Sequence, residues 1–135
     1  MLIVVSMIGL MALVAWPKVA VVFNQSQLRS ARLAVLNKFN QARMIARQSS
    51  RHAYLVRVDT LFWIERSPRL VPHGSDAFDT VGTYLNVGQY GVTVTGINRL
   101  TIDPRGLARS AGTFTLTRQG LTDSVAISGM GNVIR

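Results

Sequence analysis

The 135-residue sequence contains no cysteine, so disulfide bonds and metal sites built on thiolates are excluded. Acidic residues are also scarce: the chain has six, and none lies among residues 1–58. The first seventeen residues carry no charged side chain at all. With 48% hydrophobic and only 16% charged residues, the composition lies far from that of disordered chains. These absences indicate an ordered protein with an apolar start and a first half whose charges are all positive.

Basic residues give the chain a formal net charge of +9. Eight of them lie in residues 1–58, where no acid compensates them, whereas residues 59–135 combine seven basic residues with six acids. Such an excess is compatible with nucleic acid, anionic lipid or an acidic neighbouring protein as a partner. The charge alone does not select among these three.

The apolar segment Met1–Trp16 would span about 24 Å as a helix, somewhat less than a hydrocarbon core of ~30 Å. Residues 19–23 lengthen it, with Lys18 reaching towards the interface. A cleaved signal peptide is the alternative, but no basic segment precedes the run and no small-x-small site ends it. We therefore expect residues 1–23 to be a retained transmembrane half-helix, kinked at Pro17 where a Trp-Pro pair marks the membrane boundary.

A helical pattern continues from Val19 to His52 and predicts one element that leaves the membrane and enters a soluble domain. On a helical wheel, one arc about 80° wide holds six apolar residues and is expected to pack on the C-terminal domain. We name it the apolar arc: Leu28, Ala31, Val35, Phe39, Ala42 and Ala46. An adjoining arc about 100° wide holds five arginines and should face solvent or a partner. We name it the basic arc: Arg29, Arg32, Arg43, Arg47 and Arg51.

The remainder has the composition of strands and turns. The runs Tyr54–Asp59 and Leu61–Glu65 predict a hairpin, and the Pro- and Gly-containing segment Ser67–Thr80 predicts a loop. Five further short strands are predicted: Thr83–Val87, Val92–Thr95, Leu100–Ile102, Thr113–Thr117 and Val125–Ser128. The predicted fold class is α+β, a long N-terminal helix packed on a C-terminal antiparallel β-sheet or sandwich domain. Its predicted parts are residues 1–23 (transmembrane half-helix), 24–53 (soluble amphipathic half-helix) and 54–135 (β domain).

Residues 2–19, LIVVSMIGLMALVAWPKV, resemble the N-terminal helix of type IV pilins and type II secretion pseudopilins, with Gly9 and Pro17 at the usual places. Three C-terminal stretches are similar to the GspH/FimT branch of minor pseudopilins and minor pilins. They read LTIDPRGLA (100–108), GTFTLTR (112–118) and VAISGMGNVIR (125–135). The resemblance covers nearly the whole chain and agrees with the fold class predicted from the residues.

The resemblance implies a non-catalytic subunit that sits in the bacterial inner membrane with a single pass, with its C-terminal domain in the periplasm. It implies assembly with other pilins or pseudopilins through the N-terminal helix, into a pilus or pseudopilus and at or near its tip, and methylation of the mature protein. The family begins with a basic leader, a Gly cut site and a Phe-Thr-Leu-Ile-Glu-like opening, which in this register would precede Met1. We expect either a start codon assigned late or a truncation.

A DNA-binding minor pilin acting in DNA uptake is the alternative, and the net charge of +9 favours it. Some DNA-binding relatives have a Gly-Arg-x-Arg-like tail, whereas this chain ends GNVIR (131–135), with Asn in place of the first Arg and the second displaced. The sequence therefore favours the structural subunit. The candidate DNA contacts are arginines in or beside the predicted loops: Arg105, Arg109, Arg118 and Arg135.

Side chains suited to catalysis or metal binding are few. His73 and Asp76 are three residues apart, but they lie in a Pro/Gly-rich loop where nothing fixes both towards one point. The acids are scattered without a close pair for acid–base chemistry, and the chain has neither a G-x-S-x-G elbow nor a phosphate-binding loop. We expect no catalytic residue, no metal, no cofactor and no small-molecule substrate.

Overall fold

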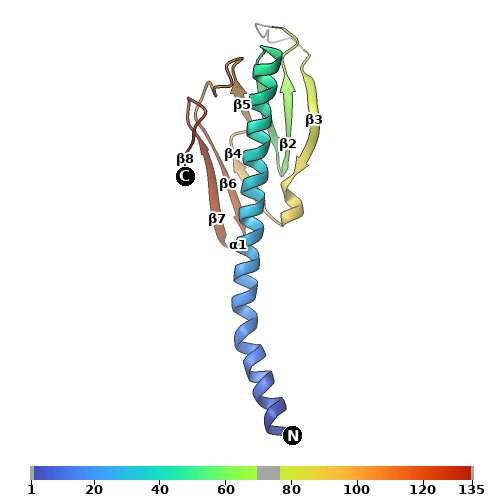
Figure 1. The fold of residues 1–135 in the computed structure, drawn as a ribbon, viewed down its shortest axis with the longest axis vertical. Coiled ribbons are helices and arrows are strands. Elements are labelled where there is room, and N and C mark those ends of the chain that lie inside the picture. Colours follow the sequence, from blue (N-terminus) through green and yellow to red (C-terminus); the bar gives the residue numbers. More distant parts are fainter. Residues whose placement is uncertain (1, 70–76, 135) are drawn as a thin grey trace.

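The first part of the chain is one helix, and strands make up most of the rest (Figure 1). The computed structural model describes the backbone of residues 2–69 and 77–134, and the side chains from residue 18 onward within those ranges. The helices are α1 (Leu2–Ser49) and the short 3-10 helix η1 (Val87–Tyr90). The strands are β1 (Ala53–Val58), β2 (Leu61–Arg66), β3 (Asp79–Asn86), β4 (Thr93–Gly96), β5 (Arg99–Ile102), β6 (Gly112–Arg118), β7 (Leu121–Ile127) and β8 (Val133–Ile134).

Helix α1 is continuous because its composition favours helix. No glycine or proline occurs in residues 18–49, and alanine, leucine, glutamine and arginine are frequent. The helix ends where Ser50 adopts a left-handed conformation (φ 51°). The amide of Arg51 then donates to the carbonyl of Ala46 (3.2 Å), a bond typical of a Schellman cap. This cap ends the helix three residues before the predicted end at His52.

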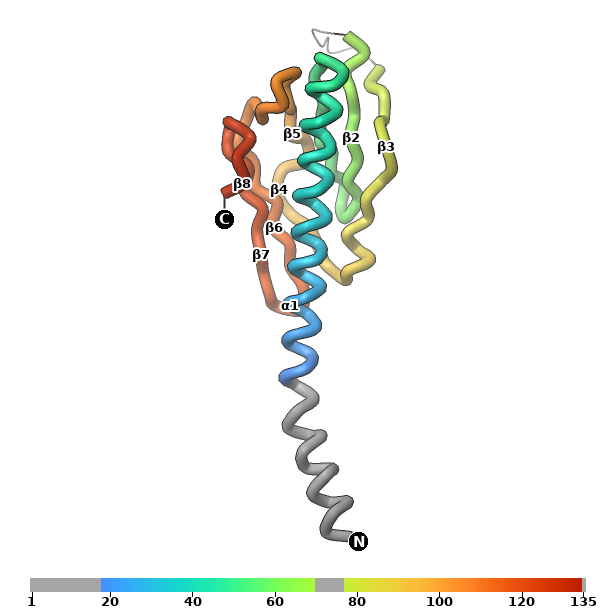
Figure 2. The backbone as a smooth tube through the Cα atoms, viewed as in Figure 1, coloured from blue at the N-terminus to red at the C-terminus, as the bar shows by residue number. Residues whose placement is uncertain are grey.

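The strands form two antiparallel sheets that lie on either side of α1 (Figures 1 and 2). One sheet has the order β3-β2-β1-β5 and the other the order β4-β6-β7-β8. The predicted hairpin is present, with Val58 paired to Leu61 across a two-residue turn. A second such hairpin joins β6 to β7, where Gln119 (φ 46°) and Gly120 (φ 81°) both have the positive φ that this turn requires.

The hydrophobic core lies between α1 and the two sheets. All six side chains of the apolar arc are buried in it, together with inward-facing residues of both sheets. Phe62 of β2 and Phe114 of β6 meet edge to face with ring centroids 5.3 Å apart, so the two sheets are also in direct contact. The apolar arc is thus occupied by the protein's own β domain.

The α+β fold class predicted from the sequence is confirmed, whereas several boundaries were wrong. Strand β3 begins at Asp79, inside the segment predicted as the loop Ser67–Thr80, and β7 begins at Leu121 rather than Val125. Two elements of the described chain were missed, namely η1 and β8. Both are short, and neither has a hydrophobic period long enough to recognise.

Several sequence predictions fall on parts of the chain that are not described. His73, Asp76 and Arg135 lie outside the described residues, as do the side chains of residues 1–17. Pro17 is within the backbone span of α1, but its side chain is not described, and the kink there stays a prediction. Within the described part of the chain, no helix is both long enough and apolar enough to cross a membrane.

Candidate functional site

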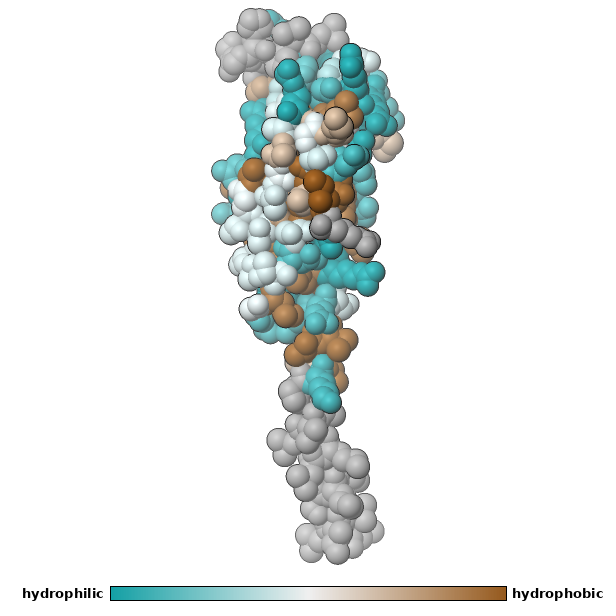
Figure 3. All heavy atoms as spheres, turned by 90° about the vertical axis from the view of Figure 1, so that its left-hand side faces the viewer, coloured by the Kyte–Doolittle hydropathy of each residue, from teal (hydrophilic) through white to brown (hydrophobic). Residues whose placement is uncertain are grey.

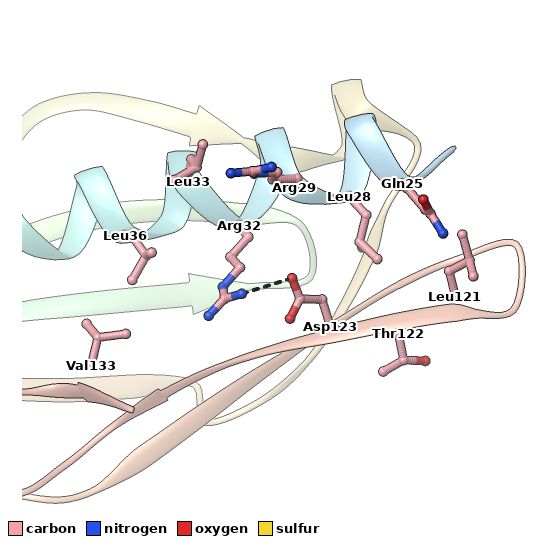
Figure 4. Close-up of a pocket in the computed structure, with 10 residues that line it drawn as sticks. All are labelled: Gln25, Leu28, Arg29, Arg32, Leu33, Leu36, Leu121, Thr122, Asp123 and Val133. Carbon is pink, nitrogen blue, oxygen red and sulfur yellow. Dashed lines mark hydrogen bonds and ion pairs between the residues drawn. The ribbon is translucent and has the colours of Figure 1, made fainter. Parts of the chain in front are cut away.

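A groove with a volume of about 670 Å³ runs between α1 and the outer edge of the β4-β6-β7-β8 sheet (Figure 4). Arg32 crosses it and pairs with Asp123 of β7, with 3.4 Å between Nη1 and Oδ2. The walls are otherwise mainly leucine and valine with polar side chains between them. The lining residues are Gln25, Leu28, Arg29, Arg32, Leu33 and Leu36 of α1, Leu121, Thr122 and Asp123 of β7, and Val133 of β8.

The groove follows an edge of the sheet that is only partly covered. Among the described residues, strand β8 pairs with β7 at Ala126 and Ile127 only, so residues 121–124 have a described strand neighbour on one side only. The carboxylate of Asp123 accepts a hydrogen bond from the amide of Ser124 (2.8 Å), and its charge discourages another strand from pairing there. The groove therefore favours an occupant that contacts side chains of α1 over one that adds to the sheet.

Further along α1, arginines of the basic arc hold the loop between β5 and β6. Arg43 Nε donates to the carbonyl of Gly106 (2.8 Å), and Arg47 Nε donates to the carbonyl of Arg105 (2.9 Å). Gly106 has φ +78°, and a Cβ at this position would lie only 2.4 Å from Arg47 Nε. Asp103 closes the turn at the start of this loop, because its Oδ1 accepts hydrogen bonds from two amides of the loop, including that of Arg105 (3.0 Å).

The expectation that the basic arc simply faces solvent or a partner was therefore incomplete. Arg32 is paired with Asp123, and Arg51 Nη1 donates to the carbonyl of Pro68 (2.6 Å). Together with the two loop contacts above, four of the five arginines reach the β domain. Arg29 is exposed on the wall of the groove.

The candidate DNA contacts do not gather in one place. Arg105 and Arg109 are exposed in the loop beside Arg47. Arg118 lies at the other end of the domain, where its Nε donates to Asn24 Oδ1 (3.0 Å) and its guanidinium lies over an aromatic ring of α1. The helix positions 24 and 47 are about 35 Å apart along α1. Of the three candidates that the structure describes, Arg105 and Arg109 share one end of the domain and Arg118 lies at the other.

Two basic side chains of the first half have structural roles that the sequence did not reveal. Arg57 is only 8% exposed, and its guanidinium donates to the carbonyls of Val94 (2.9 Å), Gly96 (2.9 Å) and Ile97 (3.0 Å). Lys38 is also buried; it donates to the carbonyl of Thr83, and burial lowers the pKa of its amine below 10.5. These contacts depend on strand register, so no local sequence pattern could have found them.

The outer face of the other sheet carries an aromatic and polar cluster. Arg99 lies 4.0 Å from the centroid of the Tyr54 ring and pairs with Glu65 (3.3 Å), whose other oxygen accepts a hydrogen bond from Trp63 Nε1 (2.9 Å). Tyr84 leans against Trp63 with 5.8 Å between ring centroids. The charges of this cluster are balanced within it, unlike those of the basic arc.

Within the described residues, no group of three or more His, Cys, Asp or Glu side chains is placed to hold a metal ion. The described part of the chain instead presents the groove beside β7 and the arginines of the basic arc.

A long N-terminal helix laid against antiparallel sheets and extending past them is a pilin-like fold. Two crystal structures of the type IV minor pilin FimU from Pseudomonas aeruginosa (strain PAO1) are similar to this chain. The P21 form superposes with a TM-score of 0.65 and 16% sequence identity, over 82% of this chain and 88% of that chain. The P65 form gives a TM-score of 0.57 and 15% identity, over 82% and 90% of the respective chains. At this identity the likeness shows the fold.

No protein-family model matches the sequence. No curated protein matches it either.

Proposed function

We propose that this protein is a non-catalytic filament subunit, a minor pilin or minor pseudopilin of the GspH/FimT type, at or near the tip of a type IV pilus or a type II secretion pseudopilus. The observation that carries this proposal is that the helix continues past the β domain with apolar side chains exposed to solvent. Val19, Val21, Val22 and Phe23 are 49–65% exposed. Figure 3 shows this hydrophobic segment between the grey part of the helix and the more polar body.

Such a surface needs a partner, because fully burying one Val or Phe side chain contributes about 1.5–3 kcal/mol. In the proposed function, the inner membrane covers this end of the helix before assembly, with the β domain in the periplasm. Helices of neighbouring subunits cover it afterwards. The pilin-like fold and the apolar residues 1–23 support this course of events.

The test replaces exposed apolar residues of the extending helix with acid. The double variant Val19→Asp/Val21→Asp should keep the stability of the β domain and be lost from sheared filaments, as measured by immunoblot of the filament fraction. Val58→Asp is the matched control, because Val58 is equally exposed (53%) but lies on β1. Normal incorporation of the double variant would contradict the proposed function.

The second candidate is a DNA-binding minor pilin. It is favoured by the loop that carries Arg105 and Arg109, because Arg43 and Arg47 contact this loop at Gly106 and Arg105. The test is an electrophoretic shift of duplex DNA by the detergent-solubilised chain across a salt series. Removing two phosphate contacts with Arg105→Ala/Arg109→Ala should weaken binding and lower the slope of log K against log salt by about 2. Absence of any shift at low salt would rule this function out.

A further inference from the structure

One exposed face of α1 has the spacing of a helix-packing seam. Val22, Arg29, Leu36 and Arg43 follow one another at intervals of seven, and the interleaved positions hold Ser26, Leu33, Asn40 and Arg47. Alternate steps of three and four residues place such positions along one side of a helix. We name these eight residues the outer stripe. None of them belongs to the apolar arc, and the stripe borders the groove beside β7 and β8.

The centre of the outer stripe is apolar. Leu33 is 51% exposed and Leu36 is half-buried at the groove, with exposed Val133 and Ile134 of β8 nearby on the sheet. Figure 3 shows hydrophobic surface in the middle of this side of the molecule, with hydrophilic surface around it. Leucines at the centre of a helical seam are the side chains into which a second helix packs.

Cations stand at both ends of this apolar centre. Arg29 lies one turn before Leu33, and Arg43 and Arg47 lie about two and three turns after Leu36. In the described part of the chain, none of these three arginines is paired with a carboxylate. Arg43 and Arg47 are held at Nε by loop carbonyls, which orders their side chains before a partner arrives. A helix that packs here must bring carboxylates, because covering unpaired guanidinium groups is costly.

A second copy of this chain does not meet that requirement. Its own helix brings no acid, since residues 1–58 contain none. Of the acids in the described β domain, Glu65, Asp79 and Asp123 are already paired with arginines, and Asp103 is bound to the amides of its own loop. The remaining one, Asp59, is a single carboxylate in the turn between β1 and β2, too few to face the arginines at both ends of the stripe. Two copies that met along the outer stripe would place like charges opposite one another, which suppresses pairing.

We propose that the outer stripe binds an α-helix of a different polypeptide, with apolar residues against Leu33 and Leu36 and with carboxylates facing Arg29 at one end and Arg43 and Arg47 at the other. The contact from Arg29 to Arg47 is about 27 Å long, or five helical turns. This inference rests on the proposed function, in which the partner is a neighbouring filament subunit. It adds that the neighbour on this side is acidic and is not a copy of the chain.

The experiment measures binding of a labelled helical peptide to the full chain in detergent by fluorescence anisotropy. The peptide has about 20 residues, two central leucines and flanking glutamates on the same side. The control peptide has the same composition with its glutamates on the opposite side. At ~50 mM salt the first peptide should bind about tenfold or more tightly than the second, and ~500 mM salt should abolish the difference.

Two variants locate the contact. Arg43→Glu/Arg47→Glu and Leu33→Asp should each weaken binding of the first peptide about tenfold. Arg109→Glu, which changes charge off the stripe, should weaken binding less than twofold, an effect of net charge alone. Leu33 is exposed, so its replacement leaves the fold intact, which a thermal melt by circular dichroism checks.

Three results would overturn the inference: equal binding of the two peptides, self-association of the chain at low salt in sedimentation that Leu33→Asp abolishes, or binding of duplex DNA without binding of either peptide. The proposed function is tested separately by filament incorporation of Val19→Asp/Val21→Asp. If the two peptides bind equally but the double variant is lost from filaments as expected, the inference fails and the proposed function stands. If the first peptide binds selectively but the double variant is incorporated normally, the proposed function fails and the binding of an acidic helix to the outer stripe stands.

Discussion

Arg57 joins strand β1 to the turn between β4 and β5, and so connects the two sheets. Its partners are backbone carbonyls and the Asn98 side chain (2.6 Å), with no carboxylate among them. A buried guanidinium in this setting depends on several carbonyl dipoles for its charge to be tolerated. Arg57 is therefore a structural arginine, although by sequence it counts among the basic residues available for a partner.

Replacement of Arg57 tests this role. Arg57→Met should lower the free energy of unfolding by about 3 kcal/mol, because it leaves buried carbonyls without donors. Arg57→Lys should lower it less, since one ammonium can reach only some of those carbonyls. Urea denaturation is the measurement. Arg109→Met, at an exposed site, is the control and should change stability by less than about 0.5 kcal/mol.

Lys38 predicts a dependence of stability on pH. Burial lowers its pKa in the folded protein below 10.5, the value expected for the unfolded chain. Between these two pKa values the unfolded state holds a proton that the folded state has lost, so the free energy of unfolding should rise with pH through that window. Below the folded pKa this contribution is a constant cost.

Denaturant unfolding of wild type and Lys38→Met, at pH values from neutral to 10.5, checks the sign. The stability of wild type relative to the variant should increase as pH approaches 10.5. A decrease over this range would show that the amine is instead stabilised in its charged form by Thr83 and Gln41.

At the scale of elements, two sides of α1 have different surroundings. The apolar arc is buried against the protein's own sheets, whereas the outer stripe is exposed apart from Leu36 and Arg43, which are partly buried. Charged replacements in the apolar arc would therefore unfold the domain before they could report on filament assembly. Variants that test assembly belong on the exposed sides of the helix.

Phe39 shows the cost of altering the apolar arc. It is completely buried between α1 and the sheets. Phe39→Ala should reduce the free energy of unfolding by about 3–5 kcal/mol, through lost burial and the cavity left behind. Met44→Ala, at an exposed position of the same helix, should change it by less than about 0.5 kcal/mol. Thermal melts of both variants give the comparison, and equal stability would contradict this account of the core.

The elements differ in how well the sequence predicts them. The 3.6-residue period of α1 extends over many turns, so its buried side could be read without a structure. The end of α1 could not, because a cap formed by Ser50 has no glycine to signal it. The groove and the contacts of Arg57 were also beyond sequence reasoning, since they arise where separate strands and α1 meet in space.

At the scale of the whole molecule, the two sheets and α1 share one core. Helix α1 packs on both sheets, and Phe62 touches Phe114 across them. We therefore expect one cooperative unfolding transition and no separate melting of either sheet.

Fluorescence of Trp63, in the β3-β2-β1-β5 sheet, can be compared with far-ultraviolet circular dichroism of the whole chain. A Trp16→Phe background leaves Trp63 as the sole tryptophan. The two denaturation curves should coincide in midpoint and slope. Distinct midpoints would show that the sheets unfold independently.

The uninterrupted helix between residues 18 and 49 also fixes the rotation of the β domain about the helix axis relative to residues 19–23. Each residue turns the chain by about 100°, and no glycine or proline in this stretch lets the turn relax. The direction in which Val19 and Val22 point therefore determines the rotational position of the sheets and of the loop at Gly106 around the helix axis. Inserting a single residue near position 20 would rotate the entire domain by about 100° relative to the partner that binds the preceding part of α1. Every contact inside the domain would stay unchanged.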